Sequence, residues 1–290
     1  MRQKILLLGC QGQLGRDLEP VLAERGDVIA KSRHDLDLRN FDQLRTEIRH
    51  LKPDIIINAA AYTAVDKAES EMALADLVNG QAPGVLATLA KIIDARLVHY
   101  STNYVFDGTQ SHPYQENDST GPVSTYGRSK LAGEVAITQV NPRYLIIRTA
   151  WVYSWHSRNF LQTMLHLGQE RSQLRVIADQ VGTPTWTQDI VRGTLSLLDN
   201  PDTSSQIVHL ANSGVASWYD FAIAIFEEAK TLGWSFAVDT VQPITTADYP
   251  TAAQRPPYSV LSLSRYQRLT GQTPPHWRSS LRSVLRGMRT

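Results

Sequence analysis

The chain has 290 residues, of which 42% are hydrophobic, and its 29 basic and 28 acidic residues give a formal net charge of +1. This balance provides no general electrostatic attraction to nucleic acid or to an anionic membrane, so neither partner is expected. The chain has one cysteine, Cys10, and no apolar run as long as a membrane span, which predicts a cytoplasmic protein without an intrachain disulfide. Composition leaves both a monomer and a homodimer open.

The N-terminal segment predicts a strand, a glycine turn and a helix. Residues 4–8 form a continuous apolar run, and apolar residues recur at helical spacing from residue 14 onward. Between them lies a G-x-x-G-x-x-G sequence, which lets the backbone approach a pyrophosphate at the helix N-terminus. A tight turn without a ligand would use the same glycines. We predict a dinucleotide site whose turn residues are Gly9, Gln11, Gly12, Gln13, Leu14 and Gly15.

The second predicted strand, residues 28–30, ends in a basic and polar tip. An acidic residue at this position would bind a ribose 2′-hydroxyl and repel a 2′-phosphate. Lys31 and Arg33 therefore favour NADP(H), with NAD(H) possible because Asp37 lies close by. A solvated turn is the alternative interpretation. The residues expected at the adenosine end of the cofactor are Arg33, Asp37 and Leu38.

Further strands and helices alternate in the first half of the chain. The remaining strands are expected at residues 55–57, 97–100 and 144–147. The helices are expected at residues 41–51, 72–94 and 126–138, with a break or kink at Pro83 in the second of them. Such alternation predicts a parallel sheet covered on both faces, with ligands at the carboxyl ends of its strands. Small residues that follow the third strand would lie against the cofactor there: Ala59, Ala60 and Ala61.

The residues expected to carry the chemistry follow the fourth strand. Thr102 lies at its end, and Tyr126 and Lys130 are four residues apart, on one face of a helix. A phenol can donate a proton if a neighbouring ammonium lowers its pKa, so we predict these three residues to be catalytic and Tyr126 and Lys130 also to bind the cofactor. The alternatives are an exposed helical pair and a hydroxyl that caps a turn. His99 is expected to be a core histidine.

The second half of the chain has a looser pattern. Helices are expected at residues 159–167, 187–198, 218–232 and 277–288, and strands at residues 174–177, 207–210 and 236–241. We predict an α/β fold: a doubly wound, Rossmann-like parallel sheet with a smaller, interleaved C-terminal substrate-binding lobe. The NADP(H)-binding domain would span residues 1–153 and the lobe mainly residues 154–290, with about 173–212 returning to the first domain.

Together these motifs resemble the extended short-chain dehydrogenase/reductase superfamily and, within it, the dTDP-4-dehydrorhamnose reductase family. The resemblance covers the chain nearly end to end, and Ala-Val-Asp-Lys-Ala-Glu and Tyr-Val-Phe-Asp-Gly are its more specific sequences. One departure is Asn103, where the family usually has aspartate. The stretches that support the resemblance are residues 58–69, 101–108, 126–134, 148–153 and 255–259.

The resemblance implies an NAD(P)H-dependent oxidoreductase that reduces the C4 ketone of dTDP-4-dehydro-L-rhamnose to dTDP-L-rhamnose. This would be the last step of dTDP-L-rhamnose biosynthesis, which supplies cell surface polysaccharides. Tyr126 would protonate the C4 oxyanion, Lys130 would hold the nicotinamide ribose, and Thr102 would orient the C4 oxygen. The residues implied to contact the nucleotide sugar are Thr63, Val65, Thr102, Tyr104, Trp151 and Arg255.

Two points remain open at the level of sequence. Some family members are dimers that share Mg²⁺ through glutamates, but Asp17 and Gln188 are a weak ligand set, so no metal is predicted. Other functions compatible with the fold are a non-catalytic NADP-binding regulatory subunit and an epimerase or dehydratase acting on another nucleotide sugar. The intact Thr102, Tyr126 and Lys130 argue against the first, and trapped NAD⁺ would identify the second.

Overall fold

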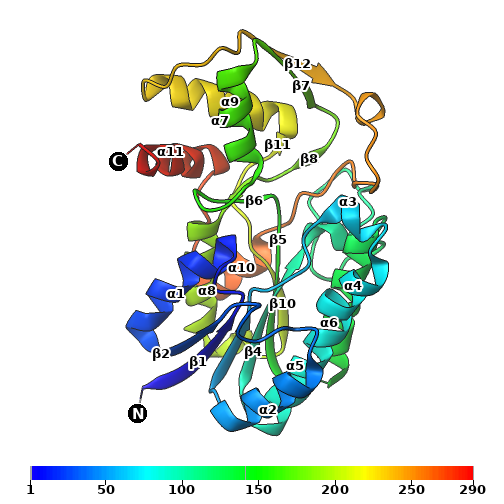
Figure 1. The fold of residues 1–290 in the computed structure, drawn as a ribbon, viewed down its shortest axis with the longest axis vertical. Coiled ribbons are helices and arrows are strands. Elements are labelled where there is room, and N and C mark those ends of the chain that lie inside the picture. Colours follow the sequence, from blue (N-terminus) through cyan, green and yellow to red (C-terminus); the bar gives the residue numbers. More distant parts are fainter. Residues whose placement is uncertain (1, 141, 290) are drawn as a thin grey trace.

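A six-stranded parallel sheet organises the larger of two lobes in the computed structural model, which describes residues 2–140 and 142–289 (Figure 1). The strands follow the order β10-β5-β4-β3-β1-β2. From β1 the chain adds β2 on one side, and from β3 onward it adds strands on the other side, so the strand order reverses between β1 and β3. Ligands of such sheets bind at the carboxyl ends of the strands beside this reversal. The predicted α/β class with a parallel sheet is confirmed. The strands are β1 (Gln3–Leu8), β2 (Gly26–Lys31), β3 (Ile55–Asn58), β4 (Arg96–Thr102), β5 (Arg143–Thr149) and β10 (Gln206–His209).

The strands are apolar on both faces because helices cover both faces of the sheet (Figure 1). Leu7 packs with Leu18 and Ile190 of the helices on one face, whereas its neighbour Leu6 packs with Leu44 of a helix on the other. The first face is covered by α1 (Gln13–Arg25), α8 (Thr187–Leu198) and α10 (Ser264–Thr270), and the second by α2 (Phe41–Leu51), α5 (Ala82–Ile92) and α6 (Thr125–Val140).

The helix expected over residues 72–94 consists of three consecutive segments. It begins as α4 (Met72–Asp76), continues as a π-helical turn (Leu77–Gln81) and ends as α5. Pro83 lies in the first turn of α5, directly after the π-helical turn, and it has no N–H to donate to a carbonyl of that turn. The predicted interruption is therefore confirmed, and the π-helical turn is the form that it takes. A short helix, α3 (Val65–Ala68), precedes this region.

The smaller lobe is built around helices rather than a large sheet. Its core contains Leu161, Phe221 and Leu281, one from each of its helices. The helices are α7 (Phe160–Glu170), α9 (Trp218–Thr231) and α11 (Trp277–Gly287). Its strand pairs are β7 (Gln173–Ile177) with β12 (Thr240–Ile244) and β8 (Val181–Gly182) with β11 (Ala216–Ser217), and β6 (Val152–Tyr153) pairs with β9 (Thr185–Trp186) where the lobes meet.

The strand expected at residues 236–241 is wrong over most of its length. Strand β12 begins only at Thr240, because Phe236 packs edge-on against Phe226 of α9, with ring centroids 5.1 Å apart, instead of joining a ladder.

Strand β7 pairs with β12, whereas α8 and β10 pack within the larger lobe. We propose that the cofactor domain comprises residues up to 153 together with α8 and β10. None of the described helices has both the length and the apolarity that crossing a membrane requires.

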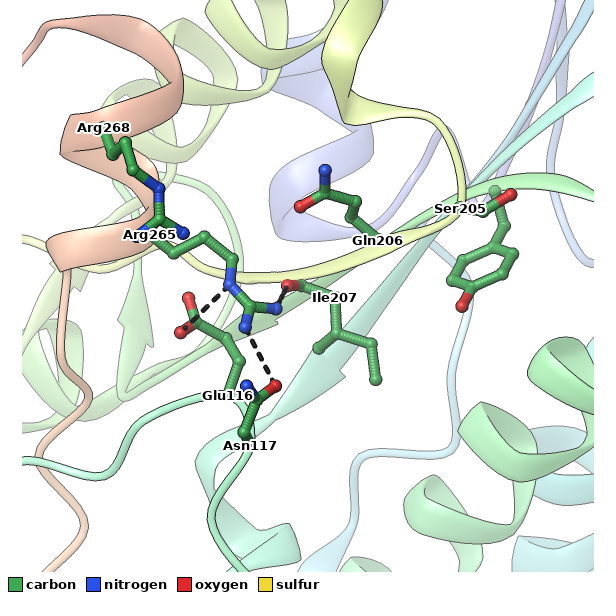
Figure 2. A pocket seen from close by; sticks show the side chains of 8 residues that line it. Glu116, Asn117, Ser205, Gln206, Ile207, Arg265 and Arg268 are labelled. Carbon is green, nitrogen blue, oxygen red and sulfur yellow. Dashed lines mark hydrogen bonds and ion pairs between the residues drawn. The ribbon is translucent and has the colours of Figure 1, made fainter.

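Side chains cover the free edge of β10 (Figure 2). Arg265 donates to the carbonyl oxygen of Ile207 at 2.8 Å and to the side chain of Asn117 at 2.9 Å. The carboxylate of Glu116 accepts the backbone N–H of His209 at 3.0 Å. These contacts satisfy edge groups that would otherwise be free to pair with another strand, beside a polar cavity of about 410 Å³.

A buried ion pair joins α6 to the sheet. The Arg148 guanidinium on β5 donates to both carboxylate oxygens of Glu134, with Nη2 2.7 Å from Oε2 and Nε 3.0 Å from Oε1. Their side chains are 4% and 2% exposed, and the Ser101 hydroxyl of β4 also donates to the carboxylate. Since a buried charge that loses its partner remains poorly solvated, this pair fixes α6 against the strand ends.

We expect Arg148→Met to lower the free energy of unfolding by about 3–5 kcal/mol, because it leaves the Glu134 carboxylate buried without a countercharge. Adding Glu134→Leu should restore part of the loss. Urea denaturation measures both changes. The control is Arg143→Met on the same strand, whose ion pair with Asp94 is exposed and should contribute within about 1 kcal/mol. Equal losses in the two single variants would contradict a special role for the buried pair.

Candidate active site

A groove of about 750 Å³ runs along the carboxyl ends of the strands of the large sheet. Its walls are the glycine turn, the tip of β2, the turn after β3 and the side of α6 that carries Tyr126 and Lys130. It brings together residues that were predicted from separate parts of the sequence. Those that line it are Gly9, Gln11, Gly12, Gln13, Leu14, Arg33, Asp37, Leu38, Ala59, Ala60, Ala61, Thr63, Tyr126 and Lys130.

The glycine turn brings the backbone close to the neighbouring segments. Gly9 has a φ of +82°, and a Cβ there would lie 2.7 Å from the backbone nitrogen of Ala60. Gly15 does not line the groove; a Cβ on it would lie 2.1 Å from the carbonyl oxygen of Gly9, so its part is to let α1 pack on the turn. The N-cap Gly12 leaves the first amides of α1 without a side-chain acceptor, and the first turn has no acidic residue. This end of α1 therefore fits a diphosphate.

The tip of β2 presents two arginines to the groove. Arg33 has no hydrogen-bond or ion-pair partner among the described residues, whereas Arg39 binds the carboxylate of Asp37 with Nε–oxygen distances of 3.0 and 2.8 Å. The Arg39 guanidinium holds the pKa of Asp37 below its usual value. Lys31, which was expected beside Arg33, is not among the lining residues.

Arg39 and Arg158 are two of the cations of this groove that sequence reasoning missed. Arg39 was not singled out, although its position two residues after Asp37 was the available signal. Arg158 lies in the loop between the lobes and lines the groove, and nothing in its neighbourhood in the sequence pointed to this position. Both add positive charge where a phosphate-bearing ligand would lie.

Tyr126 and Lys130 face the groove from one side of α6, but their electrostatics differ from the expectation. Burial raises the pKa of the Tyr126 phenol to about 12, and a hydrogen bond with Thr102 only partly opposes this shift. Burial also lowers the pKa of Lys130 to about 8. Lys130 is not among the groups that lower the pKa of Tyr126 in this arrangement, because it donates instead to the carbonyl oxygen of Tyr100 at 2.6 Å.

The residues expected to contact the substrate do not share one cavity. Thr102 is buried beside Tyr126, and Tyr104 packs edge-on against the Tyr126 ring, with centroids 5.8 Å apart. Trp151 lies outside the groove and stacks on Trp218, with ring centroids 3.5 Å apart and an interplanar angle of 4°. Val65 begins α3 and does not line the groove either.

Arg255 lies at a second cavity of about 690 Å³, which extends into the smaller lobe. Its guanidinium binds the Asp66 carboxylate through two hydrogen bonds of 3.1 and 2.7 Å and donates to the Thr251 hydroxyl at 2.6 Å. The residues of this cavity that were not predicted from the sequence, because no motif marks them, include Arg171, Arg175 and Trp218.

Asp17, one of the two residues considered as metal ligands, has a carboxylate that is already engaged by protein donors. It accepts hydrogen bonds from the Thr187 hydroxyl and, at 3.1 Å, from the side-chain amide of Gln188, and it lies 3.2 Å from Nε2 of His156. Among the described residues, no group of three or more histidines, cysteines or acidic residues is arranged to hold a metal ion.

Comparison with known proteins places the chain in one family. The RmlD substrate binding domain profile matches residues 3–290. A dTDP-4-dehydrorhamnose reductase of Burkholderia thailandensis is 42% identical, covering 98% of this chain and 99% of the relative. The reductase of Escherichia coli K12 is 40% identical, covering 97% of this chain and 96% of its own length.

Solved structures agree with the sequence relatives. The crystal structure of a dTDP-4-dehydrorhamnose reductase from Clostridium acetobutylicum superposes with a TM-score of 0.93 at 39% identity, covering 99% of this chain and 100% of that chain. The reductase of Bacillus anthracis, solved in complex with NADP, gives a TM-score of 0.92 at 34% identity and covers both chains fully. The chain therefore belongs to the RmlD substrate binding domain family, the family of the dTDP-4-dehydrorhamnose reductases.

Proposed function

We propose that the chain is an oxidoreductase that uses NADP(H), in preference to NAD(H), to reduce dTDP-4-dehydro-L-rhamnose to dTDP-L-rhamnose in the cytoplasm. The observation that carries this proposal is one groove in which the glycine turn and the N-terminus of α1 lie with Tyr126 and Lys130. The full-length similarity to dTDP-4-dehydrorhamnose reductases supports the choice of substrate. A regulatory subunit would not need the paired phenol and amine.

The site residues would divide the reaction between them. NADPH supplies the hydride that reduces the C4 ketone. The free amides of α1 bind the cofactor diphosphate, and Ala59 to Ala61 allow close packing beside it. With a pKa of about 12, Tyr126 holds its proton at neutral pH, so its phenol can donate to the C4 oxygen as negative charge develops there. Thr102 orients that oxygen.

The second cavity would receive the nucleotide part of the substrate. Arg171, Arg175 and Arg255 line it and provide cationic groups for a diphosphate, and Trp218 provides an aromatic surface. Trp151 stacks on the Trp218 ring and does not itself line the cavity, so its role is to hold Trp218 in position. Tyr104 and Arg255 interact with each other, which supports a sugar site between the groove and the second cavity.

The first test is Tyr126→Phe, which retains the ring packing and removes the proton. We expect kcat for NADPH oxidation with dTDP-4-dehydrorhamnose to fall by roughly 10²- to 10⁴-fold, the usual contribution of a positioned acid. The melting temperature should change little. Tyr144→Phe, which removes a phenolic hydroxyl at the far cavity beside β10, should leave kcat unchanged. Near-normal turnover by Tyr126→Phe would refute the proposed proton donor.

The second test concerns cofactor preference. Arg33→Ala and Arg39→Ala should each reduce the preference for NADPH over NADH by about fivefold, since one exposed charge contact contributes about 1 kcal/mol. Arg39→Ala should also improve the KM for NADH, because it frees the Asp37 carboxylate to bind a 2′-hydroxyl. Arg45→Ala, which breaks an exposed pair with Asp42 on α2, serves as the control. A wild-type protein that uses NADH better than NADPH would contradict the assignment.

The third test separates substrate binding by Arg255 from a structural role. We expect Arg255→Ala to raise the KM for the nucleotide sugar by about 10- to 100-fold with little change for NADPH, as the loss of a charge-assisted contact predicts. Asp66→Asn weakens the same ion pair but retains the guanidinium, so it should raise this KM much less. If both variants impair NADPH and sugar binding equally, Arg255 acts through folding.

A further inference from the structure

Lys130 belongs to a buried chain of three polar side chains from three different elements. Its nitrogen lies 3.2 Å from Nε2 of His99 on β4, and Nδ1 of the same ring lies 3.1 Å from the side-chain nitrogen of Asn58 at the end of β3. Asn58 and His99 are each 1% exposed and Lys130 is 2% exposed. Water therefore cannot replace any of these contacts, and each must be satisfied within the protein.

The hydrogen bonds of Asn58 determine which nitrogen of His99 carries a proton. The backbone N–H of Ala60 donates to Oδ1 of Asn58 at 3.2 Å, which orients the amide so that its NH₂ group points toward His99. Nδ1 of His99 must therefore accept. Burial and the nearby Lys130 hold the pKa of His99 well below its usual range, so the ring is neutral. A neutral imidazole that accepts at Nδ1 carries its hydrogen on Nε2.

In this tautomer, the Nε2–H group of His99 points toward Nζ of Lys130. Two donors facing each other across 3.2 Å would repel, whereas a neutral amine has a lone pair that accepts from Nε2–H. The amine still donates to the carbonyl oxygen of Tyr100. Burial lowers the pKa of Lys130 to about 8, a shift in the same direction, so the neutral amine becomes the main form above pH 8. The other titratable groups beside Lys130 are Tyr126 and Glu134 of α6, and the Glu134 charge is shared with Arg148.

We propose that Asn58 and His99 are positioning residues that increase the neutral amine fraction of Lys130 in the free protein, which dominates at alkaline pH, and that NADPH binding protonates this amine. The proton comes from solvent and forms an N–H bond on Nζ, so no other group of the protein loses a proton. The cofactor provides ribose hydroxyl oxygens and phosphate charges that favour the ammonium. This inference rests on the proposed NADP(H)-dependent function, and it makes cofactor binding the step that charges Lys130.

Isothermal titration calorimetry of NADPH binding, repeated in buffers of different ionisation enthalpy, counts the protons taken up. If Lys130 changes from a pKa of about 8 to its ordinary value of about 10.4, uptake should rise from about a quarter of a proton at pH 7.5 to about nine-tenths at pH 9. Uptake should persist in Tyr126→Phe, which excludes the phenol as its source. NADPH binding without uptake at pH 9 would overturn the inference alone, whereas a failure to bind NADPH would overturn the proposed function with it.

Asn58→Asp tests the tautomer while His99 remains in place. An aspartate offers an acceptor to both neighbours, so His99 must carry its hydrogen on Nδ1 and present a lone pair to Lys130, which then stays an ammonium. Uptake at pH 9 should fall close to zero in this variant. Asn103→Asp is the matched control, because it adds an acid at another buried asparagine near the strand ends that does not contact His99. Uptake that persists in Asn58→Asp, or is lost equally in Asn103→Asp, would overturn the assigned relay.

Discussion

The structure depends on how one face of α6 is held against β4 and β5. Tyr126, Lys130 and Glu134 are spaced four residues apart, so they form a polar stripe along a helix that is buried against the sheet. Glu134 binds Arg148 and Ser101, and Lys130 binds the Tyr100 carbonyl. A broken buried ion pair typically costs about 3–5 kcal/mol, a large part of the roughly 5–15 kcal/mol by which a domain is stable. The position of the Tyr126 phenol, the proposed proton donor, is therefore determined by contacts deeper in the fold.

The same burial determines the protonation states of the site. Burial disfavours the charged forms of the Tyr126 phenol and the Lys130 amine. It therefore keeps Tyr126 protonated and lowers the pKa of Lys130. A proton donor must hold its proton until negative charge develops on the substrate, and the raised pKa of the phenol meets this requirement. The charge that would later lower this pKa comes with the cofactor and with the ammonium form of Lys130. In the proposed reaction, cofactor binding and acid–base chemistry are coupled through this one amine.

Sequence patterns predicted the parallel sheet, the glycine turn and the shared helical face of Tyr126 and Lys130, because all of these depend on local spacing. They did not predict that Lys130 turns toward Tyr100 and His99, since that contact joins α6 to β4 across 30 residues of chain. Arg171, Arg175 and Trp218 of the second cavity were missed for the same reason: their roles depend on neighbours that no short motif encodes. Likewise, the apolar run near Phe236 looked like a strand, but its ring packs against α9.

The central claim is that this protein transfers hydride from NADPH to C4 of the sugar. Isotope labelling tests this claim most directly. NADPH labelled with deuterium at the transferred position would be incubated with dTDP-4-dehydrorhamnose, and the product examined by mass spectrometry and NMR. The proposed reaction predicts a dTDP-rhamnose heavier by about one mass unit, with deuterium at C4 and one NADP⁺ formed for each product. An unlabelled product, or conversion of the sugar without oxidation of NADPH, would contradict the claim and favour an epimerase or dehydratase that retains its own cofactor.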